Sequence, residues 1–267
     1  MLKDITIGQF FPGKSVVHRL DPRMKIILTG IYIVLLFLAK SIFALSVGIV
    51  FMLGAFLISQ IPLRLMAKSI KPIIPIIIFT AVLNLFFITT GDTLLHFWII
   101  KITTGGVKTS VFMVVRIICL IIGTSLLTYT TSPIALTDAI ERLLSPLKKI
   151  KVPVHELSMM MTIALRFIPT LIEETDKIMS AQKARGADME TGSLIQRAKA
   201  LVPILIPLFV SAFRRAEELA MAMECRCYHG GEGRTRLIQL RAAPRDFAAL
   251  LVTALFLAGV ILINRLA

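Results

Sequence analysis

The chain has 267 residues, 56% of them hydrophobic, and a mean hydropathy of +0.83. This composition excludes a soluble globular protein and is typical of an all-α polytopic membrane protein. The formal net charge of +14 does not indicate nucleic-acid binding, because the basic residues lie in segments between apolar runs, where they report membrane topology.

The first 23 residues are polar to mixed in character and lead into the first apolar run. They lack a continuous apolar core and a small-residue cleavage site, so a signal peptide is not expected. Asp21 is predicted to cap a helix that begins at Pro22, because proline at the first helical position gives up no needed N–H group. The basic residues around this cap are expected to anchor the helix at the membrane edge.

The lengths of the apolar runs predict the membrane spans. Residues 24–60 would reach about 55 Å as one helix, far more than a hydrocarbon core of about 30 Å. Two short spans with a turn at Lys40 are therefore expected. They are followed by a basic loop with Arg64, Lys68 and Lys71, a third span at 72–90, a mixed loop at 91–108 and a fourth span at 109–130. Arg116, inside the fourth span, is expected to snorkel to the interface or to face the bundle.

Residues 131–246 differ in character from the spans. They hold 17 of the 30 Lys and Arg residues and 13 of the 16 acidic residues, and a last apolar run follows at 247–263. The sequence therefore predicts about five transmembrane helices and three regions. These are residues 1–130 (N-terminal segment and four spans), 131–246 (a cytoplasmic or interfacial helical domain) and 247–267 (the last span). The positive-inside rule places the N-terminus and residues 131–246 in the cytoplasm.

Two apolar runs within this domain are not expected to cross the membrane. Residues 201–213 are too few for a span, and residues 154–172 are interrupted by Glu156 and Arg166. Both runs are predicted to be helices in or just under the inner interface. Six prolines are expected to divide the domain into stiff pieces that could pivot as units. They are Pro133, Pro146, Pro153, Pro169, Pro203 and Pro207.

The domain contains two similar halves, each of which runs from a proline through an amphipathic stretch with an acidic pair to one arginine. Helical spacing predicts an apolar face on each half. The first face is Ile168, Leu171, Ile172, Thr175, Ile178, Met179 and Gln182. The second is Phe209, Phe213, Ala216, Ala220 and Met223, opposite a polar face of Arg214, Arg215, Glu217, Glu218 and Glu224.

The two halves end at Arg185 and Arg226. Gly186 is predicted to close the first helix, and the negative end of the helix dipole favours the arginine beside it. One interpretation is that these arginines only stabilise helix ends. The other is that each docks on a partner protein, since a guanidinium with small neighbours can form a directional contact with a partner carboxylate. The repetition of the design favours the second interpretation.

Three motifs carry a family resemblance, which extends over essentially the whole chain. They are Leu20-Asp-Pro-Arg-Met-Lys25, Ala184-Arg185-Gly186 and Cys225-Arg226-Cys227. With the order of the spans, they resemble EcfT, the family of transmembrane coupling subunits of energy-coupling factor transporters, which are ABC-type importers for vitamins and trace metals. The third motif departs from the family pattern, because cysteines replace the alanine and the glycine around Arg226. Without this glycine, the motif does not predict that the helix ends in the turn geometry of the family.

The resemblance implies a non-catalytic subunit in a prokaryotic cell membrane, without a cofactor of its own. It implies that Ala184, Arg185 and Gly186 dock on one ABC ATPase and that Cys225, Arg226 and Cys227 dock on a second, as a homo- or heterodimer. It also implies that amphipathic coupling helices contact a separate membrane-embedded S-component, which selects the substrate. Methionines in the domain, such as Met159, Met160 and Met161, suit a surface that adapts to different partners.

Three other interpretations are weaker. An intramembrane enzyme needs grouped catalytic residues, yet the predicted spans contain no Asp or Glu. The sequence also has no Walker A loop, so ATP binding through such a loop is not expected. A stand-alone secondary transporter needs a polar site at mid-membrane, for which Asn84 and Arg116 offer little. A metal site at Cys225, Cys227 and His229 lacks a fourth ligand at suitable spacing.

Overall fold

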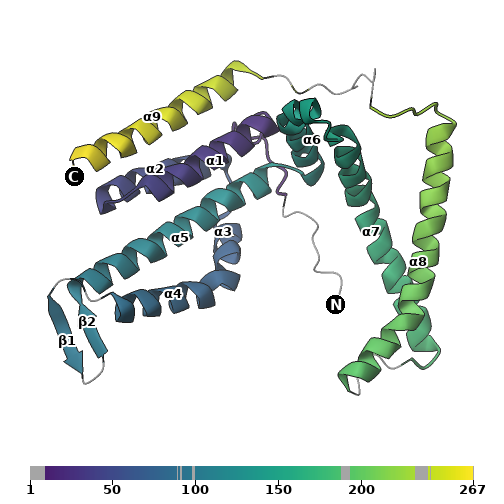
Figure 1. Cartoon of the computed structure of the whole chain (residues 1–267), viewed down its shortest axis with the longest axis horizontal. Helices are drawn as coiled ribbons and strands as arrows, with labels where there is room; N and C mark the ends of the chain where they lie inside the picture. Colours follow the sequence, from purple (N-terminus) through teal and green to yellow (C-terminus); the bar gives the residue numbers. More distant parts are fainter. Residues whose placement is uncertain are drawn as a thin grey trace. The chain divides into compact units, whose positions relative to one another are not determined.

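The computed structural model describes residues 10–88, 90, 92–97, 100–187, 193–231, 240 and 242–266. Most of these residues are helical, and one two-stranded hairpin interrupts the helices (Figure 1). The predicted all-α membrane class is thus confirmed, with this hairpin as an unexpected addition. The described residues fall into two compact units: the bundle unit, within residues 8–136 and 239–267, and the helix-pair unit, within residues 137–238.

The bundle unit contains six α-helices among its described residues, one of them short. Its elements are α1 (Pro22–Leu38), α2 (Ile42–Ser59), α3 (Leu63–Ile70), the 3₁₀ turn η2 (Lys71–Ile73), α4 (Ile74–Phe87), β1 (Thr93–Phe97), β2 (Ile100–Thr103), α5 (Thr104–Thr130) and α9 (Pro244–Leu266). Helices α1, α2, α5 and α9 pack against one another. Their core includes the fully buried Leu35, Leu36 and Val260.

The turn between α1 and α2 confirms the predicted break at Lys40. Asp21 caps α1 as expected, because its side chain accepts a hydrogen bond from the backbone N–H of Arg23, and Pro22 is the first helical residue. Ser41 caps α2 by accepting from the backbone N–H of Ala44. A new cap directly after the turn fixes the point at which the long apolar run divides.

Two loop predictions in this unit are wrong. The basic segment with Arg64, Lys68 and Lys71 is helical, and together with α4 it forms one continuous helical stretch. Pro62 precedes this stretch in an extended conformation, and the helix begins at Leu63, earlier than the apolar pattern alone indicates.

The second error concerns residues 91–108, which were expected to be a mixed loop. They contain the antiparallel strands β1 and β2, and α5 begins at Thr104. The hydroxyl of Thr103 caps α5 by accepting from the N–H of Gly106, and it donates to the carbonyl of Ile88. The backbone carbonyl of Thr90 lies so close to Gly105 that a Cβ there would clash at 2.2 Å. Glycine therefore serves close packing here and does not mark a loop.

Four helical stretches among the described residues are long and apolar enough to cross a membrane. They are Ile42–Ser59, Leu63–Phe87, Thr104–Thr130 and Pro244–Arg265. The remaining predicted span is α1, whose 17 residues lie at the lower limit for crossing a hydrocarbon core.

Arg116 faces the bundle, which is one of the two positions expected for it. Its guanidinium donates to the backbone carbonyl of Ala39 and lies over the ring of Phe112, 4.5 Å from the centroid. The arginine therefore binds a carbonyl at the C-terminal end of α1 that has no partner within that helix.

A buried polar cluster joins three helix ends of the bundle unit. The carboxylate of Asp246 accepts from the backbone N–H groups of Asp21 (2.8 Å) and Ala243 (2.6 Å), and only 1% of Asp246 is exposed. The ammonium of Lys25 donates to the carbonyls of His18 (3.0 Å) and Thr130 (2.8 Å). The N-terminal ends of α1 and α9 and the C-terminal end of α5 therefore meet at one end of the unit.

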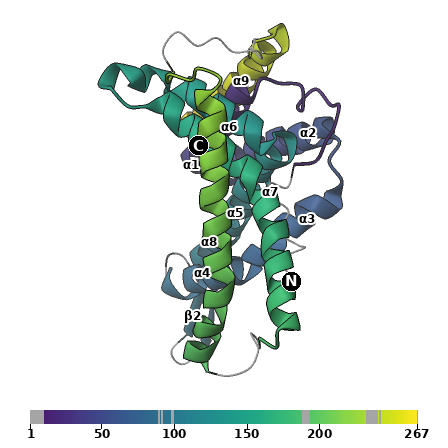
Figure 2. The same cartoon turned by 90° about the vertical axis from the view of Figure 1, so that its right-hand side faces the viewer.

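The helix-pair unit is dominated by two long helices. Its elements are α6 (Pro133–Leu144), whose first residues belong to the bundle unit, the 3₁₀ helix η3 (Ser145–Ile150), α7 (Val154–Ala184) and α8 (Leu194–Glu224). Figures 1 and 2 show α7 and α8 side by side, and the two helices are in contact. Neither is among the stretches apolar enough to span a membrane within the described part of the chain, in agreement with the sequence.

The prolines divide this unit only in part. Pro133, Pro146 and Pro153 lie at helix starts, as expected. Pro169 lies inside α7, and Pro203 and Pro207 lie inside α8, so the prediction that they separate stiff pieces is wrong. For the same reason residues 201–213 are not a short helix but the middle of a helix of 31 residues.

Candidate functional site

The first predicted docking end closes α7 with a Schellman turn, the hydrogen-bonded loop that commonly ends helices. The N–H of Gly186 donates to the carbonyl of Lys183 (3.0 Å), and the N–H of Ala187 donates to the carbonyl of Gln182 (3.0 Å). Gly186 has a φ of +86°, which only glycine adopts without strain. The predicted role of Gly186 in ending the helix is confirmed, and Arg185 is the last residue before the turn.

The second predicted docking end closes α8 with the same turn. The N–H of Cys227 donates to the carbonyl of Glu224 (2.8 Å), and the N–H of Tyr228 donates to the carbonyl of Met223 (3.1 Å). Cys227 has a φ of +53° and therefore takes the place that Gly186 has in the first turn. The replacement of glycine by cysteine does not change the turn geometry, and Arg226 corresponds to Arg185.

Both arginines are available for a partner. All six predicted docking residues are exposed: Ala184, Arg185, Gly186, Cys225, Arg226 and Cys227. Within the described part of the chain, neither Arg185 nor Arg226 has a side-chain hydrogen bond or ion pair. An exposed guanidinium without a partner in its own chain can still bind a carboxylate of another protein.

The two docking ends lie at opposite ends of an antiparallel helix pair. Near the end of α7, Gln182 contacts Pro203 of α8, whereas Glu174, further back in α7, contacts Arg215. Because Gln182 lies beside Pro203, Arg185 is level with about residue 200 of α8, and at 1.5 Å per residue Arg226 is about 40 Å further along. Two contacts so far apart suit two separate binding sites.

An ion pair between α7 and α8 fixes their register. The Arg215 guanidinium donates to one carboxylate oxygen of Glu174 at 3.0 Å, and the Ser211 hydroxyl donates to the other. These contacts hold the pKa of Glu174 below its usual range, with the hydrogen bond from Ser211 as the largest cause. Arg215 was predicted to lie on the polar face of α8 opposite its packed face, and this prediction is wrong, because Arg215 faces α7.

A second polar contact involves a proline of α8. Pro207 has no N–H, so the carbonyl of Pro203, four residues earlier, has no partner within the helix. The side-chain amide of Gln182 donates to this carbonyl at 3.4 Å. This contact lies three residues before Arg185 and fastens the first docking end to α8.

The second docking end is held by the start of α7. The Nδ1 atom of His155 lies 3.1 Å from a carboxylate oxygen of Glu141, and the side chain of Glu141 is largely buried. Gly231 packs on the His155 ring so closely that a Cβ at this position would lie 2.5 Å from it. The chain that leaves Arg226 is therefore anchored within five residues.

The apolar face predicted for α7 is confirmed, whereas the face predicted for α8 is right at Ala216, Ala220 and Met223, which line a groove toward α7, and wrong at Phe209 and Phe213. All seven predicted residues of α7 are half-buried. In α8, Phe209 and Phe213 are 60% and 71% exposed, and Ile204, Leu208 and Leu219 pack instead. Residues 201–213 of α8 are apolar on all sides, so periodicity does not select the packed face. The pairing of Arg215 with Glu174 selects it.

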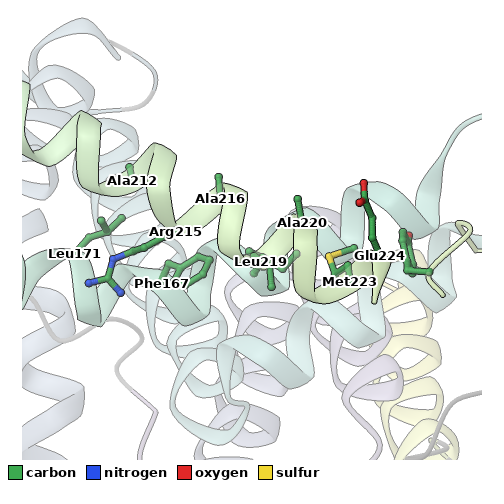
Figure 3. Close-up of a pocket in the computed structure, with 11 residues that line it drawn as sticks. Phe167, Leu171, Ala212, Arg215, Ala216, Leu219, Ala220, Met223 and Glu224 are labelled. Atoms are coloured by element: carbon green, nitrogen blue, oxygen red, sulfur yellow. The ribbon is translucent and has the colours of Figure 1, made fainter. Parts of the chain in front are cut away.

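A groove of about 480 Å³ lies between α7 and α8. Ile163, Phe167 and Leu171 of α7 form part of its lining. Ala212, Ala216 and Ala220, which lie one turn apart along α8, also line the groove (Figure 3). Leu157, Met160 and Met161 of α7 are also exposed. An apolar surface of this extent is typical of a protein or membrane contact.

The same region holds no metal-binding group among the described residues. No three His, Cys, Asp or Glu side chains converge there, and this includes Cys225, Cys227 and His229. Both cysteines are exposed and free.

Comparison with known proteins decides the family. The model of CbiQ, a family of cobalt transport proteins, matches residues 13–237, which include both helix ends. The chain belongs to the CbiQ family.

Three relatives are named "Energy-coupling factor transporter transmembrane protein EcfT". This CbiQ-family chain is 54% identical to the protein of Thermosediminibacter oceani over 261 residues, with 98% of each chain covered. It is 55% identical to the protein of Clostridium kluyveri over 267 residues, covering 100% of this chain and 98% of the relative. It is 46% identical to the protein of Bacillus subtilis over 265 residues, covering 99% and 100%. The predicted resemblance is confirmed, and the chain is a membrane component of a bacterial energy-coupling factor transporter.

Proposed function

We propose that this chain couples two ABC-type ATPases to a separate substrate-binding S-component. In this account, Arg185 docks on one ATPase and Arg226 on the other. The observation that carries the proposal is the pair of equivalent helix-ending turns, each with an exposed arginine, about 40 Å apart on one helix pair. A single partner surface would not need two equal contacts at opposite ends of the α7–α8 helix pair.

The helix pair would transmit the movement. The Glu174–Arg215 ion pair and the Gln182–Pro203 contact link the last part of α7 to the middle of α8. A displacement of either arginine end would therefore shift both helices together, and ATP-driven closing of the ATPases would move the two ends.

The apolar groove between α7 and α8, with the exposed face of α8 around Phe209 and Phe213, would receive the S-component. Exposed methionines such as Met160 suit a surface that accepts different partners. The substrate, a vitamin or a trace metal, would be chosen by the S-component and not by this chain.

The membrane orientation completes the proposal. The excess of Lys and Arg in the N-terminal segment and in residues 131–246 favours a cytoplasmic position for both. Residues 131–246 would then act as the coupling domain and present both arginines to ATPases in the cytoplasm. No residue of this chain would catalyse ATP hydrolysis.

The test is affinity purification of the tagged full chain from detergent-solubilised membranes of its native host, followed by mass spectrometry. We expect two ABC ATPases and a small membrane protein to accompany the chain. The double variant Arg185→Glu/Arg226→Glu is expected to lose the ATPases and keep its own fold. Arg214→Glu is the matched control, because Arg214 is also exposed on α8 but lies away from the helix end. If the double variant retained the ATPases and supported uptake, the proposal would be wrong.

A further inference from the structure

A second cavity, of about 550 Å³, lies within the bundle unit between α1, α2, α5 and α9. One end is lined by Lys25, Thr130 and Arg245, which belong to helix ends of the polar cluster. The other end is lined by Tyr32, Phe51 and Phe256. The cavity therefore has a polar end at the N-terminal side of α1 and α9 and an aromatic end deeper in the bundle.

The depth of the cavity corresponds to one leaflet of a bilayer. Arg245 and Phe256 are eleven residues apart on α9 and both line the cavity. At 1.5 Å per residue this spacing is about 16 Å, roughly half of a hydrocarbon core of about 30 Å. A ligand in the cavity would reach from the membrane surface to the middle of the bilayer.

The inner end of the cavity is a packed aromatic floor. The ring of Phe51 lies 5.8 Å from that of Tyr32 and 5.1 Å from that of Phe256, centroid to centroid. Tyr32 also packs directly on Gly123, where a Cβ would lie 2.2 Å from the ring, and its hydroxyl donates to the carbonyl of Cys119. These contacts hold the floor in place, so the cavity has a defined bottom.

The walls of the cavity are almost entirely aliphatic. Val50, Leu126 and Val252 contribute from three different helices. Gly54 also lines the cavity, and no atom lies within 4 Å of the position that its Cβ would occupy. An apolar chain therefore fits between the helices without displacing a side chain.

The polar end carries one cation without a partner in the described part of the chain. Lys25 already donates to two backbone carbonyls. Arg245 is exposed and has no side-chain hydrogen bond or ion pair within the described residues. It lies in the first turn of α9 beside Asp246, whose buried carboxylate is occupied by two backbone N–H groups. The guanidinium therefore remains available to pair with a bound anion.

We propose that this cavity binds an anionic glycerophospholipid of the adjacent leaflet, with an acyl chain along the aliphatic walls and the phosphate at Arg245. Basic sites between transmembrane helices at the cytoplasmic side are suited to anionic headgroups. The proposal depends on the membrane position of the bundle unit and not on the docking of ATPases.

The test uses the purified full chain in detergent and native mass spectrometry. Phosphatidylglycerol and phosphatidylcholine with identical acyl chains are titrated separately, and glycerol phosphate is added as a headgroup without chains. We expect one phosphatidylglycerol molecule to bind about tenfold more tightly than phosphatidylcholine. Glycerol phosphate is expected not to displace it, because the acyl chain contributes most of the contact.

Two variants with matched controls separate the parts of the site. Gly54→Leu fills the cavity and is expected to lower phosphatidylglycerol binding at least tenfold, whereas Gly30→Leu, at an open position outside the cavity, leaves it unchanged. Arg245→Gln is expected to abolish the preference for phosphatidylglycerol, whereas Arg265→Gln, near the other end of α9, preserves it. Unfolding temperatures show whether each variant is folded.

Equal binding of both lipids, or lipid binding that is unaffected by Gly54→Leu in a folded variant, would overturn the proposal. Displacement by glycerol phosphate would assign the site to a free phosphate compound and would overturn it as well. If the Gly54→Leu variant lost a protein that accompanies the wild-type chain but still bound the lipid, a protein would cover the cavity. This result would contradict a lipid occupant.

Discussion

Gly186 and Cys227 hold the same position in two copies of one turn, each with a positive φ and each directly after an exposed arginine. The two turns differ in their conformational strain, because a side chain in the left-handed region costs about 1–2 kcal/mol. The chain accepts this cost at Cys227 and keeps the turn, which places Arg226 as Gly186 places Arg185.

Replacing Cys227 by glycine is therefore expected to stabilise the second turn by about 0.5–1 kcal/mol, because the relief of strain exceeds the added freedom of glycine in the unfolded chain. Hydrogen–deuterium exchange of the Tyr228 amide, which donates to Met223 across the turn, should become slower. Gly186→Ala is the converse control and should speed exchange at Ala187. Faster exchange in Cys227→Gly would contradict this assignment of strain.

The Glu174–Arg215 pair makes the helix pair sensitive to acid. The pKa of Glu174 is lowered in the folded chain by Ser211 first and by Arg215 second. A depressed carboxyl pKa contributes stability that is fully present above its unfolded value of about 4.3 and is lost as the pH falls through the folded pKa. The protection factors of amides within α7 and α8, which allow for the slower intrinsic exchange in acid, should therefore fall below about pH 4.3.

Glu174→Gln should remove this acid dependence and weaken the helix pair by about 0.5–1.5 kcal/mol at neutral pH, since the pair is partly exposed. Glu173→Gln is the control, because the neighbouring Glu173 is exposed. If both variants exchanged alike at neutral pH, the ion pair would not fix the register.

The carboxylate of Asp246 is expected to stabilise the bundle unit strongly. Asp246→Ala leaves the backbone N–H groups of Asp21 and Ala243 without their acceptor in a buried position. We expect a loss of about 2–4 kcal/mol, measured as a lower unfolding temperature in detergent. Asp92→Ala, at an exposed position of the same unit, should have little effect. An unchanged unfolding temperature in Asp246→Ala would show that the cluster is not structural.

Gly123 is expected to be irreplaceable in α5. A Cβ at this position would meet the ring of Tyr32 at 2.2 Å, so Gly123→Ala forces Tyr32 out of place and should cost about 1–3 kcal/mol. Gly259→Ala in α9 is the matched control, because nothing lies within 4 Å of its Cβ position and alanine favours the helix. The unfolding temperature should fall in the first variant and stay level or rise in the second.

The sequence predicted those features that depend on local chemistry. The caps at Asp21 and Pro22, the break at Lys40 and the turn at Gly186 were all predicted from single residues with strong positional preferences. The face of α7 was predicted because its apolar residues follow one helical period.

Other features depend on contacts between distant residues, and the sequence pattern could not supply them. The packed face of α8 is selected by Glu174, 41 residues before Arg215. Pro207 remains inside α8, and the carbonyl that it leaves free accepts from Gln182 in the neighbouring helix. The β-hairpin was missed because short strands bounded by glycine read as a loop when only local composition is considered.

The central claim is that Arg185 and Arg226 dock on two ATPases, and the most direct measurement is the mass of the purified complex. Native mass spectrometry of the wild-type complex is expected to show two ATPase subunits for each copy of this chain. Arg185→Glu and Arg226→Glu should each weaken the assembly, and the double variant should release both ATPases, whereas Arg214→Glu keeps both. A double variant that still carries two ATPases would contradict the account.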